Sequence, residues 1–306
     1  MTLKKDILTL SHLDLDDFDQ LFTRAAELKD RRKKGIIEKS LIGRTVGLIF
    51  QKPSTRTRVS FEAATAQLGG TPLFIQAGDT QLSRNEPIAD TARVLERYLD
   101  ALVLRTYSQA MQEEFARIAS IPIVNALTDL YHPCQVLSDL MTVIEFKGGY
   151  EGLNIAWIGD GNNMAHSWIN AAAVLGFSLT LACPEGYMPD PAVLSDAKAM
   201  AGDRIIVTTD PHEAVAGADV INTDVWASMG QEDQSESRRQ FFAPYQVNRE
   251  LLSEAAADAI VMHCLPAHRG EEITADVLEG EQSVVWDQTE NKLHMHKAIL
   301  EILIVG

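Results

Sequence analysis

The chain has 306 residues and a formal net charge of -16, with 46% hydrophobic and 23% charged residues. This length allows two domains of ordinary size, and the composition is that of a soluble globular protein. The negative charge argues against a nucleic-acid partner, because it repels phosphate backbones over long range. An anionic ligand would therefore need a local cluster of positive groups.

Cysteine usage and hydropathy exclude several other classes. Cys134, Cys183 and Cys264 are too few and too widely spaced for a disulfide framework. CxxC and HExxH elements are lacking, so no metal or other cofactor is expected. The first residues lack the apolar stretch of a signal peptide, and no apolar run approaches the length of a membrane span. These features predict a cytoplasmic protein with reduced thiols and no membrane partner.

Patterns typical of strands and helices alternate along nearly the whole chain, which predicts an α/β fold. A helix is expected over residues 13–34, because Phe18, Phe22 and Ala25 recur on one face. Strands and helices then follow one another up to a Gly-Gly pair at 148–149. The predicted strands are 45–50, 72–75, 101–104 and 121–124, and the predicted helices are 54–68, 88–98, 108–118 and 133–146.

The Gly-Gly-Tyr-Glu-Gly stretch at 148–152 is the expected boundary between a first domain, 1–148, and a second, 149–306. A last helix at about 290–304 is expected to pack back on the first domain. Each domain should hold a mainly parallel sheet flanked by helices, whose ligands bind beyond the carboxyl ends of the strands. The strands predicted for the second domain are 154–158, 178–182, 204–207, 219–223, 259–263 and 283–286.

The segment Ser54-Thr55-Arg56-Thr57-Arg58 follows the first predicted strand and opens the next helix. Its three hydroxyls and two guanidinium groups lie within about one turn, where backbone N–H groups and the helix dipole favour an anion. Ser54 alone could be a simple N-cap, but capping explains one hydroxyl and neither arginine. Arg58 could pair with Glu62, so it is expected to have a supporting role. The segment therefore predicts an anion site.

The longer stretch from Phe50 to Glu62, FQKPSTRTRVSFE, resembles the carbamoyl-phosphate signature of the aspartate and ornithine carbamoyltransferases. This motif is long and specific to the superfamily, but it does not identify the second substrate. The family resemblance continues in later segments up to Lys292 and so covers nearly the whole chain. It implies two α/β domains with the site in the cleft between them.

Several residues that follow predicted strands match the family's carbamoyl-phosphate contacts. Without the resemblance, Arg105 would be an ordinary surface residue, and His132 and Gln135 a helix cap and an exposed amide. The resemblance implies that Arg105 and His132 polarise the carbonyl oxygen and that Gln135 orients the carbamoyl nitrogen. Fixed donors are needed there because attack by an amine places negative charge on that oxygen. The implied contacts are Ser54, Thr55, Arg56, Thr57, Gln81, Arg105, His132, Pro133, Cys134, Gln135, Cys264, Leu265 and Lys292.

Two of these contacts have further implications. Gln81 lies in the polar loop 76–87, whose counterpart in the family reaches a neighbouring subunit's site, so a homotrimer with shared sites is implied, with higher assemblies of trimers open. Lys292 stands where the family usually has Arg. Lysine keeps the charge but loses the bidentate geometry of arginine, which makes this contact the least secure.

The Gly159-Asp160-Gly161-Asn162-Asn163 turn follows the first predicted strand of the second domain. A dinucleotide-binding turn is the alternative, but Met164 occupies the position of the third glycine, so the pattern does not favour NAD. The amides of Asn162 and Asn163 suit a zwitterionic amino acid instead. By resemblance, Asn163 is an ornithine contact.

Two further segments distinguish the second substrate. Asp224, Ser228 and Met229 lie in a Ser-Met-Gly loop that resembles the ornithine-binding loop, and a carboxylate there would favour a charged amine. Cys264 lies in a His-Cys-Leu-Pro motif, where the family's cysteine borders the δ-amino group. The implied catalytic residues are Cys264, Asp224, Arg105 and His132, with Asp224 and Cys264 helping the δ-amine to lose its proton. Covalent catalysis by Cys264 is the competing hypothesis.

The resemblance therefore implies transfer of a carbamoyl group from carbamoyl phosphate to L-ornithine, giving L-citrulline and phosphate, most simply for arginine biosynthesis. A sister transferase acting on aspartate, putrescine or an acylated ornithine is the alternative of the same class. A non-catalytic phosphate-binding module is the alternative of another class. The residues do not distinguish arginine synthesis from citrulline breakdown.

Overall fold

The computed structural model describes residues 5–76, 78, 80, 86–227 and 235–306. The chain divides into two compact units, each built around a parallel sheet. Unit 1 comprises Met1–Met141 with Glu290–Gly306, and unit 2 comprises Thr142–Thr289. The expected α/β class, with two parallel sheets flanked by helices, is confirmed.

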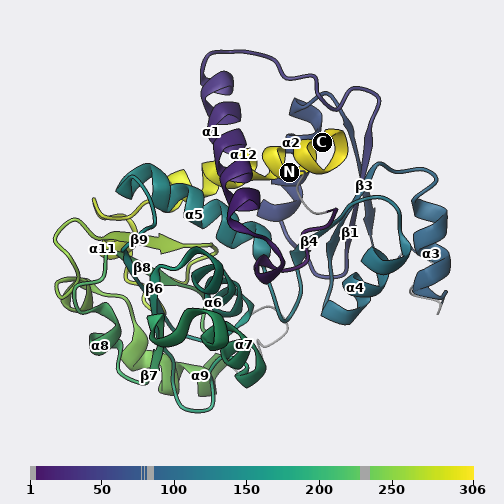
Figure 1. Cartoon of the computed structure of the whole chain (residues 1–306). Helices are drawn as coiled ribbons and strands as arrows, with labels where there is room; N and C mark the ends of the chain where they lie inside the picture. The colour runs from purple at the N-terminus through teal and green to yellow at the C-terminus, as the bar shows by residue number, and fades with distance from the viewer. Residues whose placement is uncertain (1–4, 77, 79, 81–85, 228–234) are drawn as a thin grey trace. The chain divides into compact units, whose positions relative to one another are not determined.

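Unit 1 holds a four-stranded parallel sheet in the order β2-β1-β3-β4. Strands β1 (Thr45–Phe50), β3 (Ala101–Arg105) and β4 (Ile123–Leu127) are buried almost throughout, as expected for a sheet covered on both faces. Strand β2 (Thr71–Gln76) lies at one edge and is partly exposed. The other edge is covered by a bridge between Ile7 and Val124. The helices with residues in this unit are α1 (Leu15–Lys33), α2 (Arg56–Gln67), α3 (Ile88–Leu95), α4 (Gln109–Ile118), α5 (Pro133–Lys147) and α12 (Val285–Val305), after a 3-10 turn, η1 (Leu10–His12) (Figure 1).

Unit 2 holds a five-stranded parallel sheet in the order β7-β6-β5-β8-β9. Its inner face packs on an apolar core that includes Ile158, Val261 and Leu278. The strands are β5 (Asn154–Ile158), β6 (Ser178–Ala182), β7 (Ile205–Thr208), β8 (Val220–Thr223) and β9 (Ile260–His263). The helices are α6 (Asn163–Leu175), α7 (Pro191–Ala201), α8 (Pro211–Val215), α9 (Ser235–Phe242), α10 (Arg249–Leu252) and α11 (Ala275–Leu278), with 3-10 turns η4 (Gly202–Arg204) and η6 (Ala243–Tyr245).

Both sheets reverse their winding at a definable point. In unit 1 the chain runs from β1 outward to β2 and then returns to β3 on the other side of β1. In unit 2 it runs from β5 through β6 to β7 and returns to β8 on the other side of β5. Ligands of open α/β sheets bind at such switch points, beyond the carboxyl ends of the strands. The ends of β1 and β3, and of β5 and β8, are therefore the expected ligand-binding positions.

The strand predicted at 283–286 is wrong. Ser283 forms only an isolated bridge with Val261, and α12 begins at Val285, earlier than the predicted start near residue 290. The Val-Val-Trp run favours a strand by propensity, but Val285 packs in the apolar core as the first residue of a helix. The other predicted elements are present with boundaries shifted by a few residues. The predicted domain boundary at 148–152 lies just after α5, whereas the compact units divide inside that helix.

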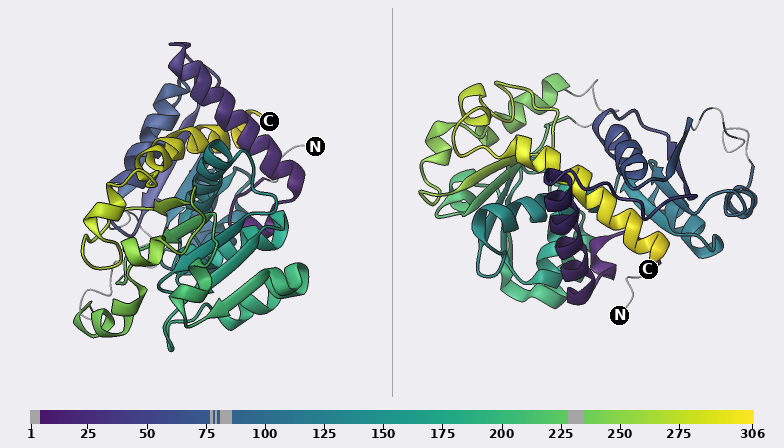
Figure 2. Two further views of the ribbon diagram at one scale, coloured as in Figure 1. Left: turned by 90° about the vertical axis from the view of Figure 1, so that its left-hand side faces the viewer. Right: turned by 90° about the horizontal axis from the view of Figure 1, so that it is seen from above.

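Helix α12 is tied to α1 and α2 within unit 1 by buried polar contacts. Lys29 of α1 donates to Asn291 Oδ1 at 2.6 Å, and His296 stacks on the Phe61 ring of α2 with 3.6 Å between ring centroids. His296 Nδ1 also lies 2.9 Å from Ser60 Oγ. Figure 2 shows α12 crossing α1. No helix in the described part of the chain is long and apolar enough to cross a membrane.

These buried histidines should make the protein sensitive to acid. Burial lowers the pKa of His294 to about 4 and holds that of His296 well below its usual range. Below the ordinary histidine pKa of 6.5, these side chains are protonated in the unfolded chain but remain neutral in the folded chain. The free energy of unfolding therefore falls as the pH drops from 6.5 toward 4, and these groups do not affect it above pH 6.5. His294→Gln should reduce this slope by roughly 1.4 kcal/mol per pH unit, measured by urea unfolding. The exposed His12→Gln should leave the slope unchanged; a parallel slope for both variants would contradict the assignment.

Candidate active site

The phosphate turn, defined as Ser54–Arg58, lies at the switch point of unit 1. Phe50, the last residue of β1, pairs with Arg105, the last residue of β3, and Gln51 N donates to Arg105 O at 2.8 Å. This register brings the turn after β1 and the Arg105 side chain to the same edge of the sheet. Arg105 is buried, with 3% of its surface exposed.

Within the phosphate turn, one hydroxyl caps the helix and the other groups are disposed differently. Ser54 Oγ accepts from Thr57 N at 3.3 Å, as expected of a cap, whereas Thr55 makes no side-chain capping bond. Arg58 pairs with Glu62 at 3.0 Å and stacks over the Phe74 ring at 3.5 Å, which agrees with its supporting role. Arg56 forms no ion pair with any residue the structure describes. The turn thus keeps a guanidinium group and backbone N–H groups available to an anion.

Helix α5 begins just beyond the end of β4, and its first turn carries the next predicted residues. Pro133 is its first residue, and His132 O accepts from Gln135 N at 3.2 Å. Cys134 points away from this end, because its thiol donates to Asn125 O of β4 at 3.3 Å. Burial raises the pKa of Cys134 to about 12, so this thiol is an inert packing group.

Gln135 is oriented by a lysine from α12. Lys292 Nζ donates to Gln135 Oε1 at 2.5 Å, and Gln135 Nε2 donates to Asp139 Oδ1 at 2.8 Å. Because an ammonium group can only donate, the amide oxygen of Gln135 must face Lys292. Lysine at this position therefore contacts the residue that is expected to orient the carbamoyl nitrogen.

His132 lies among these positive groups and is neutral. Burial, with Lys292, Arg105 and His296 nearby, holds the pKa of His132 well below its usual range. A neutral imidazole can donate one N–H bond without adding charge. Together with Arg105, it provides the kind of donor pair that stabilises an oxygen on which negative charge develops.

The switch point of unit 2 holds an amide and a carboxylate in contact. Asn162 caps α6 by accepting from Met164 N at 2.9 Å and Ala165 N at 3.2 Å, and its Nδ2 donates to Asp224 Oδ2 at 3.2 Å. Asn163 is the first residue of α6. A Cβ on Gly161 would lie 2.3 Å from Pro189 N, so this glycine is required by local packing, and a phosphate-binding role is not needed to explain it.

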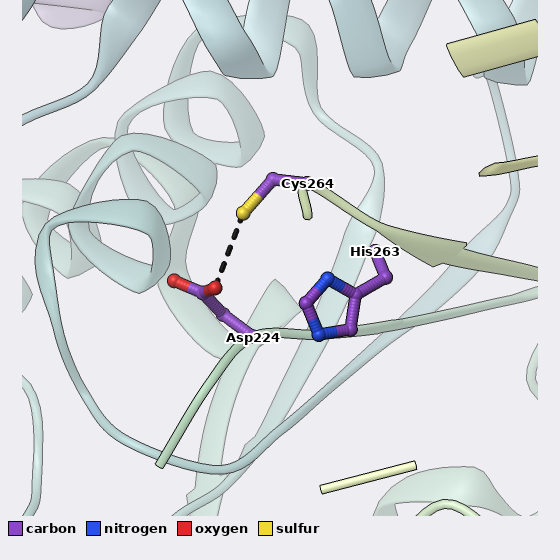
Figure 3. Close-up of side chains that lie close together, drawn as sticks. All are labelled: Asp224, His263 and Cys264. Atoms are coloured by element: carbon purple, nitrogen blue, oxygen red, sulfur yellow. Dashed lines mark hydrogen bonds between the residues drawn. The ribbon is translucent and has the colours of Figure 1, made fainter. Parts of the chain in front are cut away.

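Asp224 also receives the thiol of Cys264. Cys264 Sγ donates to Asp224 Oδ1 at 3.2 Å (Figure 3). Val225 N donates to the same oxygen at 2.8 Å. Asp224 is 8% exposed, whereas Cys264 is partly exposed. A carboxylate with a thiol beside it can hold a cationic amine and then stay close to it as its proton leaves.

His263 orients the segment that follows Cys264. Its Nδ1 accepts from Leu265 N at 2.8 Å, and its Nε2 lies 3.0 Å from Glu272 Oε1. The imidazole is therefore protonated on Nε2, and the pair is fully buried. Leu265 has a φ of 59°, a conformation this bond helps to hold. Donor atoms of Asp224, His263 and Cys264 lie within 4.8 Å of one another, but both ring nitrogens of His263 are engaged, which leaves no lone pair for a metal.

Arg238 of α9 was not among the predicted residues, although it connects several parts of the unit 2 site. It donates to Asp160 Oδ2 at 2.6 Å and to Trp226 O at 2.7 Å, and it lies 4.7 Å from the centre of the Tyr187 ring. Asp160 belongs to the turn that contains Asn162. Burial raises the pKa of Asp160, Arg238 opposes this, and Asp224 adds to it. The only sequence signal was the acidic residue Asp160, placed two positions after the strand that ends at Ile158.

The predicted residues fall into three groups. In unit 1, Ser54 to Thr57, Arg105, His132, Gln135 and Lys292 belong to one region, the unit 1 half-site. In unit 2, Asp224 and Cys264 meet directly, Leu265 follows them, and Asn163 lies next to Asn162, forming the unit 2 half-site. Gln81, Ser228 and Met229 lie outside the described residues. The roles assigned to all these residues stay predictions.

Two family models match the chain along nearly its whole length. Residues 5–145 match the carbamoyl-P binding domain of aspartate/ornithine carbamoyltransferase, and residues 151–303 match the Asp/Orn binding domain. The chain therefore belongs to the aspartate/ornithine carbamoyltransferase family.

Within this family, the chain is similar to several proteins named ornithine carbamoyltransferase. A relative from Desulfotalea psychrophila, named ornithine carbamoyltransferase, is 60% identical over 286 residues, which is 94% of each chain. One of the same name from Geobacter sulfurreducens is 55% identical over 98% of this chain and 99% of its own. The structure of ornithine carbamoyltransferase from Pyrococcus furiosus superimposes with a TM-score of 0.96 at 47% identity, covering 100% of this chain and 99% of that one.

The buried pair of Arg238 with Asp160 yields a stability prediction. Arg238→Gln leaves a buried carboxylate without its cation, which should lower the free energy of unfolding by about 3 kcal/mol. Adding Asp160→Asn to that variant should restore at least roughly 1 kcal/mol, because the uncompensated charge is then removed. The neighbouring Arg239→Gln breaks an exposed pair with Glu271 and should cost under about 1 kcal/mol. Urea unfolding of these three variants and of Asp160→Asn alone tests this; strictly additive losses would rule out the coupling.

Proposed function

We propose that this chain transfers the carbamoyl group of carbamoyl phosphate to the δ-amine of L-ornithine, giving L-citrulline and phosphate. The observation that carries the proposal is the chemistry at the two switch points. Unit 1 gathers a helix start, Arg56, Arg105 and a neutral His132, while unit 2 offers Asp224 in contact with Cys264. The names of relatives that are 52–60% identical support ornithine as the acceptor.

The unit 1 half-site would bind carbamoyl phosphate. The phosphate is held by Ser54, Thr55, Arg56 and Thr57 together with the N–H groups of the α2 start, which stabilise its growing charge as it leaves. Loss of one donor to a developing oxyanion typically costs roughly a hundredfold or more in turnover. Arg105 and His132 are the proposed oxyanion donors.

Gln135 orients the carbamoyl nitrogen through its amide oxygen, which still has a second lone pair beside the bond from Lys292. Lys292 thus acts first as a positioning group and second as a positive charge near the substrate. Cys134 and Pro133 shape the start of α5, and Leu265 follows Cys264 in the chain.

The unit 2 half-site would bind ornithine. Asp224 and Asn163, with Ser228 and Met229, hold the amino acid end, and Cys264 borders the δ-amine. The δ-amine attacks only as the neutral base, so its proton must leave first. The nitrogen then bonds to the carbamoyl carbon, the bond from that carbon to the phosphate oxygen breaks, and phosphate departs with the electron pair while the second amine proton is lost.

A panel of amines tests the proposed acceptor. Purified enzyme with carbamoyl phosphate should release phosphate and form citrulline with L-ornithine, and should give under about 1% of that rate with L-aspartate, putrescine or N-acetyl-L-ornithine. Arg56→Gln should remove one charge-assisted hydrogen bond to the phosphate. The KM for carbamoyl phosphate should therefore rise at least about tenfold, with a smaller rise in the KM for ornithine. Turnover with aspartate alone would refute ornithine, and phosphate binding without any turnover would indicate a non-catalytic module.

The same assay separates the roles of Cys264. Cys264→Ala should still form citrulline, but about a hundredfold more slowly, if the thiol positions the amine and assists proton loss. Complete loss of citrulline formation with normal substrate binding would favour the covalent alternative. Cys183→Ala serves as the control, because that thiol is buried at the end of β6 and burial raises its pKa.

The domains and assembly follow as part of the proposal. Residues 1–148 form the carbamoyl-phosphate domain and 149–306 the ornithine domain, with the last helix belonging to the first. A homotrimer is proposed from the family resemblance, and the open edge strand β2 supports it: Leu73 on β2 and Val59 on α2 are 46% and 56% exposed. The mass in solution should be three times that of the chain, and Leu73→Lys should weaken the assembly. A monomer with full activity would contradict shared sites.

We also propose a cytoplasmic enzyme of arginine biosynthesis. A similar structure from Campylobacter jejuni, 38% identical with a TM-score of 0.90, is described as an anabolic ornithine carbamoyltransferase, which supports this direction. Growth without arginine, restored in a strain that lacks this activity, is the expected check.

A further inference from the structure

A hollow of about 530 Å³ opens on unit 1 and shares no lining residue with the unit 1 half-site. It is lined by the end of α1 and the segment after it, by the end of α2 and by Lys297 of α12. The phosphate turn lies at the other end of α2, about 18 Å away along a 12-residue helix. The hollow is therefore separate from the site already described.

Lys297 is the unusual residue of this hollow. It is 2% exposed, yet it makes no hydrogen bond or ion pair with any residue in the described part of unit 1. The other buried lysines there all have acceptors: Lys29 on Asn291, Lys52 on Asp129 and Lys292 on Gln135. Most of the Lys297 side chain is buried, but its Nζ is not one of the fully enclosed polar atoms without a partner, so the ammonium group reaches the hollow, where a ligand can meet it.

The charges around Lys297 favour an anion. Arg32 and Lys39 also line the hollow, so three cations face it. Two carboxylates attract Lys297, Glu38 of the lining and Glu301 of α12, but each is already paired, with Arg31 and Arg24 respectively. This local excess of positive charge stands out in a chain of net charge -16.

The rest of the lining is apolar and exposed. Ile36, Ile37 and Ile42 are 42%, 78% and 63% exposed, and all three border the hollow. A free inorganic anion would leave these side chains in water. An anion that carries an apolar group would cover them while its charged group met Lys297.

We propose that this hollow is a second ligand site, which binds a small organic anion. The carboxylate or phosphate of this anion pairs with Lys297. Arg32 and Lys39 lie at the rim of the hollow, and the apolar part of the ligand contacts Ile36, Ile37 and Ile42. Burial lowers the pKa of Lys297, and a bound anion would favour its charged form. Because salt screens charge–charge attraction, binding of the anion should weaken as the salt concentration is raised. The attraction to the exposed cations at the rim should weaken most.

Two probes of matched shape test the proposal, phenyl phosphate and phenylacetate, with benzyl alcohol as the neutral control. Each is titrated by calorimetry into the whole protein, Lys297→Met and Arg56→Gln. At least one anionic probe should bind the wild type, bind Lys297→Met at least about tenfold more weakly, and bind Arg56→Gln unchanged. The probe that binds shows whether phosphate or carboxylate is preferred.

Stability separates a ligand-binding lysine from a structural one. Lys297→Met should keep or raise the thermal midpoint, because it removes a charge without a hydrogen-bonded acceptor from a largely buried side chain, and it should leave citrulline formation unchanged. Lys33→Met, an exposed lysine at the end of α1, is the matched control and should alter neither binding nor stability. The proposal is overturned if neither anion binds, if Lys297→Met binds as well as wild type, if Arg56→Gln alone abolishes binding, or if Lys297→Met lowers the midpoint by several degrees.

Discussion

The parallel pairing of β1 with β3 and of β5 with β8 is the constraint on which the rest of the structure depends. In both units the chain leaves one central strand and returns on its other side, so the segments after the two strands run in opposite directions. Side chains at those strand ends can then face a ligand without being covered by a crossing connection. Arg105 and Asp224 each occupy such a position, at the end of β3 and directly after β8.

The two half-sites carry opposite charge, and in each unit neighbouring groups determine the sign of that charge. In unit 1, burial keeps His132 uncharged, and the positive charge rests on Arg105 and Lys292. In unit 2, Arg238 neutralises Asp160, so that Asp224 remains the one carboxylate at the switch point without a cation among the described residues. A phosphate and an ammonium group are the natural complements of these two environments.

The sequence was most informative where the chemistry is local. The phosphate turn, the start of α5 and the positions of most strands along the chain could be predicted because neighbouring residues define them. The strand predicted at 283–286 failed because packing of Val285 in the core outweighed β propensity. Arg238 was missed because its partner is recognisable only once folding has brought distant segments together: Arg238 and Asp160 are 78 positions apart. The contact between Lys292 and Gln135, which spans 157 positions, likewise needed the structure to be seen.

The neutral state of His132 has a consequence for how the protein would respond to its surroundings. Arginine does not change charge at any physiological pH, and His132 is held uncharged well below neutrality. The guanidinium and imidazole part of the unit 1 half-site therefore presents a constant electrostatic field while the cell's acidity drifts. A change of activity with pH near neutrality would then arise chiefly from the substrate, whose amine must lose its proton before it attacks. The charges of Arg105 and His132 would stay the same over this range.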